Sequence, residues 1–225
     1  MDTPLYFGHR ARLKEKLLKN GVDSLADYEV LELLLMQTIF RKDVKPLAKE
    51  LLKKFGSFAG VLNASVEELC SVPGVSRNVA THFKITLAAC THLRKIQIQT
   101  QPIFKNWDVL KDYCLMKIAY ESIECMHILY LNIKCQLIKD EEHQRGTFSY
   151  TSMYPREILK QALNLGAVSV ILVHNHPSGD PTPSQADIRN TKALQEILEK
   201  VDISIFDHLI IGKGNICSFR ELGLL

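Results

Sequence analysis

One stretch of the chain places two histidines at the end of a buried strand, and it constrains the fold more than any other feature. The apolar run Val170-Ile171-Leu172-Val173 is followed at once by His174-Asn175-His176 and then by a proline-rich loop. In an extended backbone, residues two apart project from the same side, about 6.5–7 Å apart at their Cα atoms. The two imidazoles are therefore able to converge on one small cation at the strand end.

A carboxylate downstream supplies a third ligand. Asp187 would complete a mixed His, His, Asp set and leave a fourth position for water, which is typical of catalytic rather than structural zinc. Asp180 is the alternative ligand, although Gly179-Asp180-Pro181 also has the composition of a turn. Ser184 to Asp187 has the pattern of a capping box with Ser184 at the N-cap, and such a helix end would hold Asp187 rigidly. The segment predicts a metal-dependent hydrolase.

The spacing His-x-His-Pro-x6-Ser-x2-Asp resembles the signature of the JAB/MPN (JAMM) zinc metallohydrolases, and the wider sequence resembles the RadC family, the DNA repair protein RadC group. The resemblance covers essentially the whole chain. The pieces that carry it are Arg145-Gly146-Thr147, Tyr154-Pro155-Arg156-Glu157-Ile158, Ile171 to Ser184, and Asp207-His208-Leu209-Ile210-Ile211-Gly212.

The resemblance implies a Zn²⁺ ion with His174, His176 and Asp187 as its ligands. It also implies a role for Ser184, which is similar to the family serine that hydrogen-bonds near the developing oxyanion. Such a donor is typically worth about 2.7–4 kcal/mol of transition-state stabilisation. The alternative role of Ser184, as a helix N-cap, is worth about 1 kcal/mol.

The resemblance further implies a glutamate at the start of an upstream strand, and the matching run here is Glu124 to Asn132. Glu124 would then be the general base that deprotonates a zinc-activated water, because a base must lie within hydrogen-bond reach of that water. Glu121 is the alternative base. The implied activity is that of a metallopeptidase or isopeptidase acting on a peptide or protein substrate.

Composition is that of an ordinary soluble globular chain, with 225 residues, 46% hydrophobic and 24% charged. No apolar run approaches the roughly 18–20 residues of a membrane span, and Met1 to Arg12 has no apolar region typical of a signal peptide. The six cysteines are scattered without a Cys-x-x-Cys pair, which indicates reduced thiols. We expect a cytoplasmic protein with no membrane partner.

Hydrophobic periodicity divides the chain into two predicted domains, residues 1–100 and residues 101–225. The first is helical from His9 to Ile96, whereas strands alternate with helices from Glu124 onward. Gln97 to Pro102 is predicted to be a linker. The expected fold is α+β, with a helix-hairpin-helix-like module followed by an α/β JAB/MPN domain that has a mixed sheet flanked by helices.

The helical half contains Val72-Pro73-Gly74-Val75-Ser76, which resembles the turn of a helix-hairpin-helix that offers backbone N–H groups to a phosphate. It departs from that pattern at Ser76, where a second glycine is usual. Residues 1–100 carry 15 Lys and Arg against 10 Asp and Glu, a net charge of +5, whereas residues 101–225 carry a net charge of −2. DNA is therefore a candidate partner through residues 65–95.

Three functions remain open at this stage. The leading hypothesis is a zinc-dependent metallohydrolase, and the second is a DNA-associated repair or nuclease factor recruited through the helical module. The third is a scaffold that holds a metal without turnover, and the presence of a candidate base disfavours it. The sequence does not give the physiological substrate or the oligomeric state.

Overall fold

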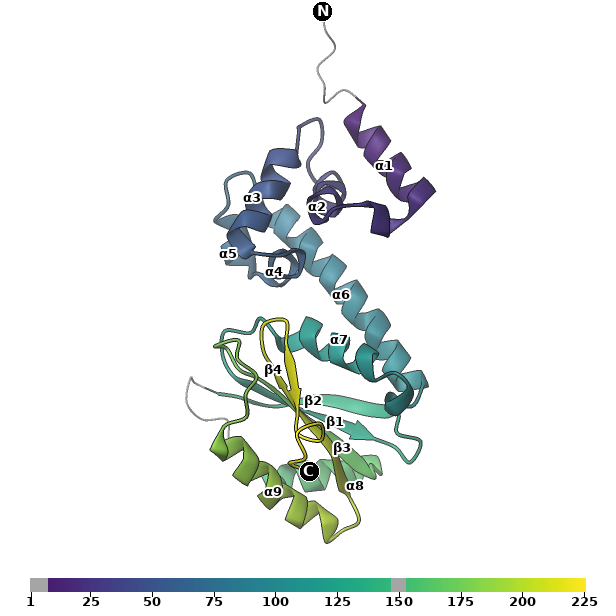
Figure 1. Cartoon of the computed structure of the whole chain (residues 1–225), viewed down its shortest axis with the longest axis vertical. Coiled ribbons are helices and arrows are strands. Elements are labelled where there is room, and N and C mark those ends of the chain that lie inside the picture. The colour runs from purple at the N-terminus through teal and green to yellow at the C-terminus, as the bar shows by residue number, and fades with distance from the viewer. Residues whose placement is uncertain (1–7, 147–152) are drawn as a thin grey trace, which may run out of the picture. The chain divides into compact units, whose positions relative to one another are not determined.

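A computed structural model of the chain describes residues 8–146 and 153–225, so Thr147, which carries part of the RadC resemblance, lies outside the described residues. The chain divides into two compact units, Met1–Ala89 and Cys90–Leu225 (Figure 1). No helix among the described residues is both long enough and apolar enough to cross a membrane. Each unit is described by itself.

The N-terminal unit is helical, as the sequence predicts. Its elements are α1 (His9–Asn20), a 3-10 turn (Val22–Ser24), α2 (Asp27–Leu35), α3 (Lys45–Phe55), α4 (Phe58–Asn63), α5 (Val66–Cys70) and the first part of α6 (Arg77–Thr100). Fully buried Leu31, Leu51 and Phe83 lie in one shared apolar core. A capping box is present at Ser65, whose hydroxyl accepts from the Glu68 amide.

The C-terminal unit is built on a mixed five-stranded sheet with the order β2-β1-β3-β4-β5. Its strands are β1 (Cys125–Leu131), β2 (Leu137–Arg145), β3 (Ser169–Asn175), β4 (Ser204–Ile211) and β5 (Ile216–Ser218). Only β3 and β4 pair in parallel, whereas β1 pairs antiparallel with both β2 and β3, and β5 pairs antiparallel with β4. The predicted α+β class with a mixed sheet is confirmed.

Helices cover both faces of this sheet (Figure 1). Helix α7 (Trp107–Ile118) packs on one face, where its apolar residues share a core with Leu129 and Val173. Helices α8 (Pro155–Leu165) and α9 (Gln185–Glu199) pack on the other face with Ile128 and Leu172. Because neighbouring strand residues point to opposite faces, His174 projects toward the face that carries α8 and α9.

The predicted linker is wrong over Gln97 to Thr100, because α6 continues without a break to Thr100. The physical reason is packing: Ile98 is fully buried in the core shared with α7, so this segment is held in place. The helix ends where Pro102, which has no N–H to donate, removes the next helical hydrogen bond. The division between the compact units falls earlier, within α6.

A charged network is buried between α7 and strand β2, a strand that the sequence did not predict. The carboxylate of Asp140, whose side chain is fully buried, accepts hydrogen bonds from Tyr113, Lys117 and His127. Burial raises the pKa of Asp140, but the hydrogen bond from His127 and the charge and hydrogen bond of Lys117 outweigh it and hold the pKa below its usual range. The network ties the edge strand to the helix layer.

We expect Asp140→Asn to lower the free energy of unfolding by about 3 kcal/mol, because it removes one partner of a buried ion pair. Urea denaturation at pH 7 measures this change. The folded-state pKa is depressed, so the stabilisation is present above the unfolded pKa of about 3.9 and is lost as the pH falls. The difference in the free energy of unfolding between the wild type and Asp140→Asn should therefore become smaller below about pH 4.

Asp112→Asn is the matched control, because Asp112 forms a largely exposed pair with Arg94. Exposed pairs contribute about 0–1 kcal/mol, so this variant should unfold almost as the wild type does. Equal stability of the Asp140 and Asp112 variants would contradict the role assigned to the buried network.

Candidate metal centre

The two histidines lie at the carboxyl end of β3, a central strand of the sheet whose seven residues are all buried. His174 pairs with Met126 of β1 and with Ile210 of β4, so its backbone is fixed on both sides. The amide of His176 donates to the carbonyl of Ile211 at 2.9 Å. The end of β3 therefore presents both imidazoles from a rigid support.

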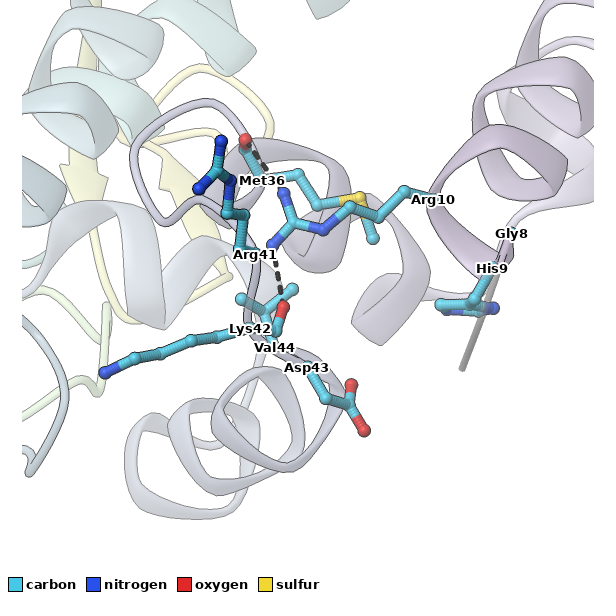
Figure 2. A pocket seen from close by; sticks show the side chains of 8 residues that line it. All are labelled: Gly8, His9, Arg10, Met36, Arg41, Lys42, Asp43 and Val44. Carbon is cyan, nitrogen blue, oxygen red and sulfur yellow. Dashed lines mark hydrogen bonds between the residues drawn. The ribbon is translucent and has the colours of Figure 1, made fainter. Parts of the chain in front are cut away.

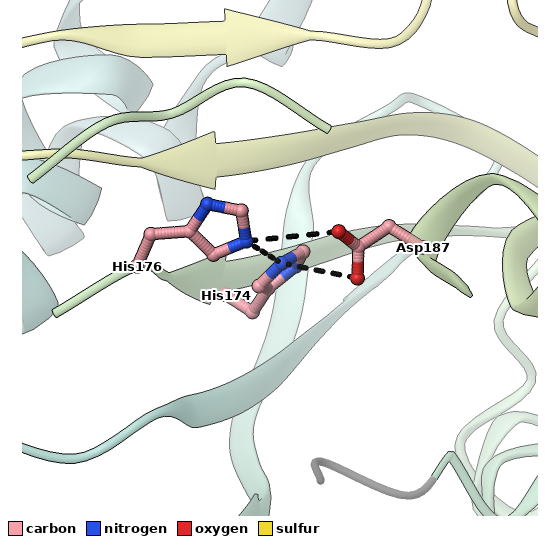
Figure 3. Close-up of side chains that lie close together, drawn as sticks. All are labelled: His174, His176 and Asp187. Atoms are coloured by element: carbon pink, nitrogen blue, oxygen red, sulfur yellow. Dashed lines mark hydrogen bonds and ion pairs between the residues drawn. The ribbon is translucent and has the colours of Figure 1, made fainter. Parts of the chain in front are cut away.

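Helix α9 brings the carboxylate. Its N-terminus forms the predicted capping box, in which Ser184 Oγ accepts from the Asp187 amide at 3.1 Å and Asp187 Oδ2 accepts from the Ser184 amide at 2.8 Å. The cap fixes the orientation of the Asp187 side chain, which lies beside the two histidines (Figure 3). Capping and presentation of the carboxylate thus occur together, as the sequence indicated.

Three potential ligand atoms converge on one point. The Nε2 atoms of His174 and His176 lie 3.1 Å apart, with Asp187 Oδ1 at 3.5 Å from His174 Nε2 and Asp187 Oδ2 at 3.6 Å from His176 Nε2. With bonds of about 2.0–2.1 Å, tetrahedral ligand atoms are separated by about 3.3–3.4 Å. The three residues each offer one ligand atom within 4.8 Å of the others, close enough to share one metal ion, and the described residues contain this one such group.

A buried hydrogen-bond chain fixes the tautomer of His174. The Thr191 hydroxyl donates its proton to the Asp187 carbonyl at 2.6 Å, so Thr191 Oγ1 accepts from His208 Nδ1–H at 2.7 Å. Because burial holds the pKa of His208 well below its usual value, His208 is neutral and its Nε2 accepts from His174 Nδ1–H at 2.8 Å. The Nε2 of His174 is then left with its lone pair toward the centre.

His176 is oriented by a backbone contact. Its Nδ1–H donates to the Asp180 carbonyl at 2.8 Å, which leaves Nε2 to face Asp187. Its contact with Asp187 raises the pKa of His176, whereas burial lowers the pKa of His174 to about 4. Burial raises the pKa of Asp187, but its contacts with the histidines and Ser184 outweigh this and hold it below its usual range. When His176 is deprotonated, two lone pairs and an anionic carboxylate face each other, an arrangement that a shared cation stabilises.

Glu124 lies beside the centre, whereas Glu121 is turned to another partner. Glu124 Oε1 is 4.0 Å from His174 Nε2, and its side chain is 20% exposed. The Glu121 carboxylate instead pairs with Arg145 at 2.8 Å. Geometry therefore favours Glu124 over Glu121 as the group next to a metal-bound water.

The remaining predicted residues occupy the loop between β3 and α9. The Asp180 carboxylate accepts from the amide and hydroxyl of Thr182, so it serves the turn and lies outside the three-ligand cluster. Ser184 is exposed and uses a lone pair of Oγ in the helix cap. Because Ser184 Oγ acts only as an acceptor in the cap, its hydroxyl proton can be donated to another group.

A close backbone contact holds this loop against the β4–β5 hairpin, whose turn spans residues 212–215. The Lys213 amide donates to the Gly179 carbonyl at 3.3 Å. A Cβ atom on Gly212 would lie 2.3 Å from that carbonyl oxygen and 3.0 Å from Pro181 Cδ. Only glycine fits at position 212, because the loop and hairpin backbones touch there.

Sequence reasoning assigned no role to His208 and Thr191, which contact His174 and Asp187. It also assigned none to Asn175, which binds the backbone on both sides of Glu124. His208 belongs to the run that carried the RadC resemblance, and Thr191 lies four residues after Asp187 on the buried face of α9. That i, i+4 spacing places Thr191 next to Asp187 on one helix face, which is a usable signal. Nothing in the sequence near Thr191 indicated its contact with His208 of β4.

The N-terminal unit has a separate cavity of about 300 Å³ (Figure 2), which contains none of the five predicted site residues. Arg10 reaches into it from α1 and donates to the carbonyls of Met36, Ile39 and Lys42. Its guanidinium therefore holds the loop between α2 and α3.

The hairpin-like turn predicted in the N-terminal unit joins α5 to α6. Gly74 has a φ of 92°, and Ser76 Oγ accepts from the Val79 amide at 3.4 Å at the start of α6. Ser76, where the helix-hairpin-helix pattern usually has glycine, thus has its side chain at the helix cap. Contact of DNA with residues 65–95 remains a prediction.

Comparison with known proteins covers nearly the whole chain. Residues 104–224 match a family described as a RadC-like JAB domain, and residues 7–81 match one described as UPF0758 N-terminal. A UPF0758 protein of Ruegeria pomeroyi is 46% identical over 217 residues, which is 96% of this chain and 97% of that protein. A UPF0758 protein of Rhodobacter capsulatus is 46% identical over 213 residues, or 95% of this chain and 100% of that protein.

We expect Gly212→Ala to weaken the binding of a divalent metal on the order of 10–100-fold, the usual cost of disturbing the groups that orient metal ligands. The added methyl displaces the 179–181 segment, whose Asp180 carbonyl orients His176. Titration of the apoprotein with metal measures the change. Gly214→Ala is the control: it strains a φ of 89° but meets no atom within 4 Å, so metal binding should persist.

Proposed function

Because the chain belongs to the RadC family, as its sequence motifs predicted, we propose that it is a zinc-dependent hydrolase that cleaves a peptide or isopeptide bond. The observation that carries this proposal is the convergence of His174 Nε2, His176 Nε2 and the Asp187 carboxylate at metal-ligand spacing. Glu124 adds a carboxylate beside that point.

The donor set suits zinc and a catalytic role. Two imidazoles and one carboxylate are common zinc ligands, and a set of three protein ligands leaves one position for water. His174 is fully buried, whereas the side chains of His176 and Asp187 are 19% and 16% exposed. One side of the proposed centre is therefore open to solvent and to a substrate.

When bound, Zn²⁺ lowers the pKa of a coordinated water to about 7 and polarises a carbonyl oxygen. His174, His176 and Asp187 would hold the ion. Glu124 would accept the proton of the attacking water and deliver it to the leaving nitrogen. Ser184, whose hydroxyl proton is not used by the helix cap, would donate to the developing oxyanion.

Peptide or isopeptide hydrolysis fits these roles because its difficult steps are attack on a carbonyl and protonation of an amine. One carboxylate that first accepts and later donates a proton serves both steps. A scaffold that only binds metal has no use for Glu124 beside its ligands. The alternative, a DNA-associated nuclease or repair factor, rests on the N-terminal turn and on charge, which lie outside this site.

Glu124→Gln should retain zinc and reduce hydrolysis by about 10²–10⁴-fold, since glutamine keeps the size of the side chain but does not accept a proton. The measurement is the cleavage rate of a peptide or isopeptide substrate identified by screening. Glu121→Gln is the matched control, because Glu121 pairs with Arg145. Loss of activity in the Glu121 variant alone would transfer the base role to Glu121.

Thr191→Val should weaken zinc binding by about 10–100-fold, because the isosteric change removes the acceptor that fixes the tautomers of His208 and His174. Competition with a chelating dye of known affinity measures the effect. Thr86→Val is the control: Thr86 makes the same type of hydroxyl contact to the carbonyl four residues earlier, in α6. Unchanged zinc affinity in the Thr191 variant would refute the hydrogen-bond chain as a determinant of binding.

A further inference from the structure

The backbone segment that carries Glu124 precedes β1 and is not paired with β3. The β1–β3 ladder ends at the pair Met126–His174, although β1 itself begins one residue earlier at Cys125. Beyond that pair, β3 continues alongside β4, with Asn175 opposite Ile211. The backbone from Glu121 to Cys125 therefore needs hydrogen-bond partners other than the main chain of β3.

The side chain of Asn175 supplies those partners. Its Oδ1 accepts from the Cys125 amide at 2.7 Å, and its Nδ2 donates to the carbonyls of Glu121 and Ile123 at 3.2 Å and 3.1 Å. Asn175 is fully buried. Both of its amide N–H groups and its carbonyl are thus directed at one short segment of backbone, on both sides of Glu124 in sequence.

We propose that Asn175 is the positioning residue for Glu124, holding residues 121–125 so that the Glu124 carboxylate faces the proposed metal centre. This inference rests on the proposed function, in which Glu124 is the base. It assigns the residue between the two histidines a role distinct from theirs: His174 and His176 hold the metal, and Asn175 sets the distance from the metal to the base.

The position of Asn175 in the strand makes the arrangement effective. Successive strand residues are about 3.3 Å apart along the backbone, so the Asn175 side chain and its neighbours His174 and His176 are held by the same piece of backbone. The segment also has other contacts: the Glu121 amide donates to the Ile118 carbonyl at 3.2 Å, and Cys125 pairs with Arg145 in the β1–β2 ladder. The Gly146 amide donates to the Glu124 carbonyl at 2.9 Å, and the exposed Glu121–Arg145 ion pair contributes little.

A general base is sensitive to such positioning, because it acts only within hydrogen-bond reach of the water. Replacing Asn175 with alanine leaves a buried amide and two carbonyls without their partners, which costs each group its desolvation penalty. The segment is then expected to relax toward solvent and to take Glu124 with it. The metal ligands themselves keep their supports on β3 and α9.

The test is a double-mutant cycle on the full-length protein loaded with Co²⁺, whose visible absorption reports the water and its hydrogen-bonding neighbours. The proteins compared at one fixed pH are the wild type, Asn175→Ala, Glu124→Gln and the double variant. If Asn175 acts through Glu124, Asn175→Ala should change the spectrum in the same direction as Glu124→Gln, and the double variant should show no further change.

Hydrogen exchange of the Cys125 amide gives a second readout, and it should accelerate by about tenfold or more in Asn175→Ala. Tyr113→Phe is the matched control, because it removes a buried hydrogen bond on the other face of the sheet. It should lower stability while leaving the Co²⁺ spectrum as in the wild type. If Asn175→Ala does not fold, Asn175→Asp is used, which keeps the acceptor for Cys125 but loses both donors.

An Asn175 variant with a wild-type spectrum, or a double variant in which the two changes add, would overturn the proposal and leave Asn175 a purely structural residue. Wild-type protein that binds no Co²⁺ would overturn the proposed function, and the role of Asn175 with it. The two failures are therefore distinguishable in the same experiment.

Discussion

The proposed centre depends on where β3 ends relative to the first turn of α9. The ladder with β1 and β4 fixes His174, and the capping box fixes Asp187, so two independent supports meet at one point. A preorganised donor set of this kind lowers the cost of binding, because the ligands are not reordered when a cation arrives.

The electrostatic environment sets the protonation states of His174 and Asp187. Burial and the chain from Thr191 through His208 favour a neutral His174 with its Nε2 lone pair inward. The nearby Asp187 remains anionic. Electron-rich atoms so close together repel one another unless a positive charge lies between them. The geometry therefore favours a positive charge between these atoms, either a proton on His176, whose pKa is raised, or a divalent ion.

Local patterns in the sequence were sufficient for much of the site. The two histidines after an apolar run, and the serine and aspartate of the capping box, are close in sequence, so strand and helix periodicity places them correctly. Periodicity failed where tertiary packing decides. Strand β2 is polar because it is a half-exposed edge strand, and its buried Asp140 is paired with Lys117 of α7. The predicted linker is helical because Ile98 enters a core.

Two of the residues that sequence reasoning missed, His208 and Asn175, have partners that are distant in the chain. His208 contacts a histidine 34 residues earlier, and Asn175 holds a segment about 50 residues earlier. Such contacts become visible only when the sheet order is known. Glu124 was placed by family resemblance, and the structure brings it to the centre through the backbone that Asn175 binds.

Zinc content of the purified wild-type chain, compared with His176→Ala by elemental analysis, tests the central claim most directly. His176 is the partly exposed ligand, so its replacement disturbs the buried core least. The account predicts about one zinc per wild-type chain, loss of most of it in the variant, and an unchanged circular dichroism spectrum. Equal metal content in the two proteins, or a wild-type chain that takes up no zinc from added Zn²⁺, would contradict it.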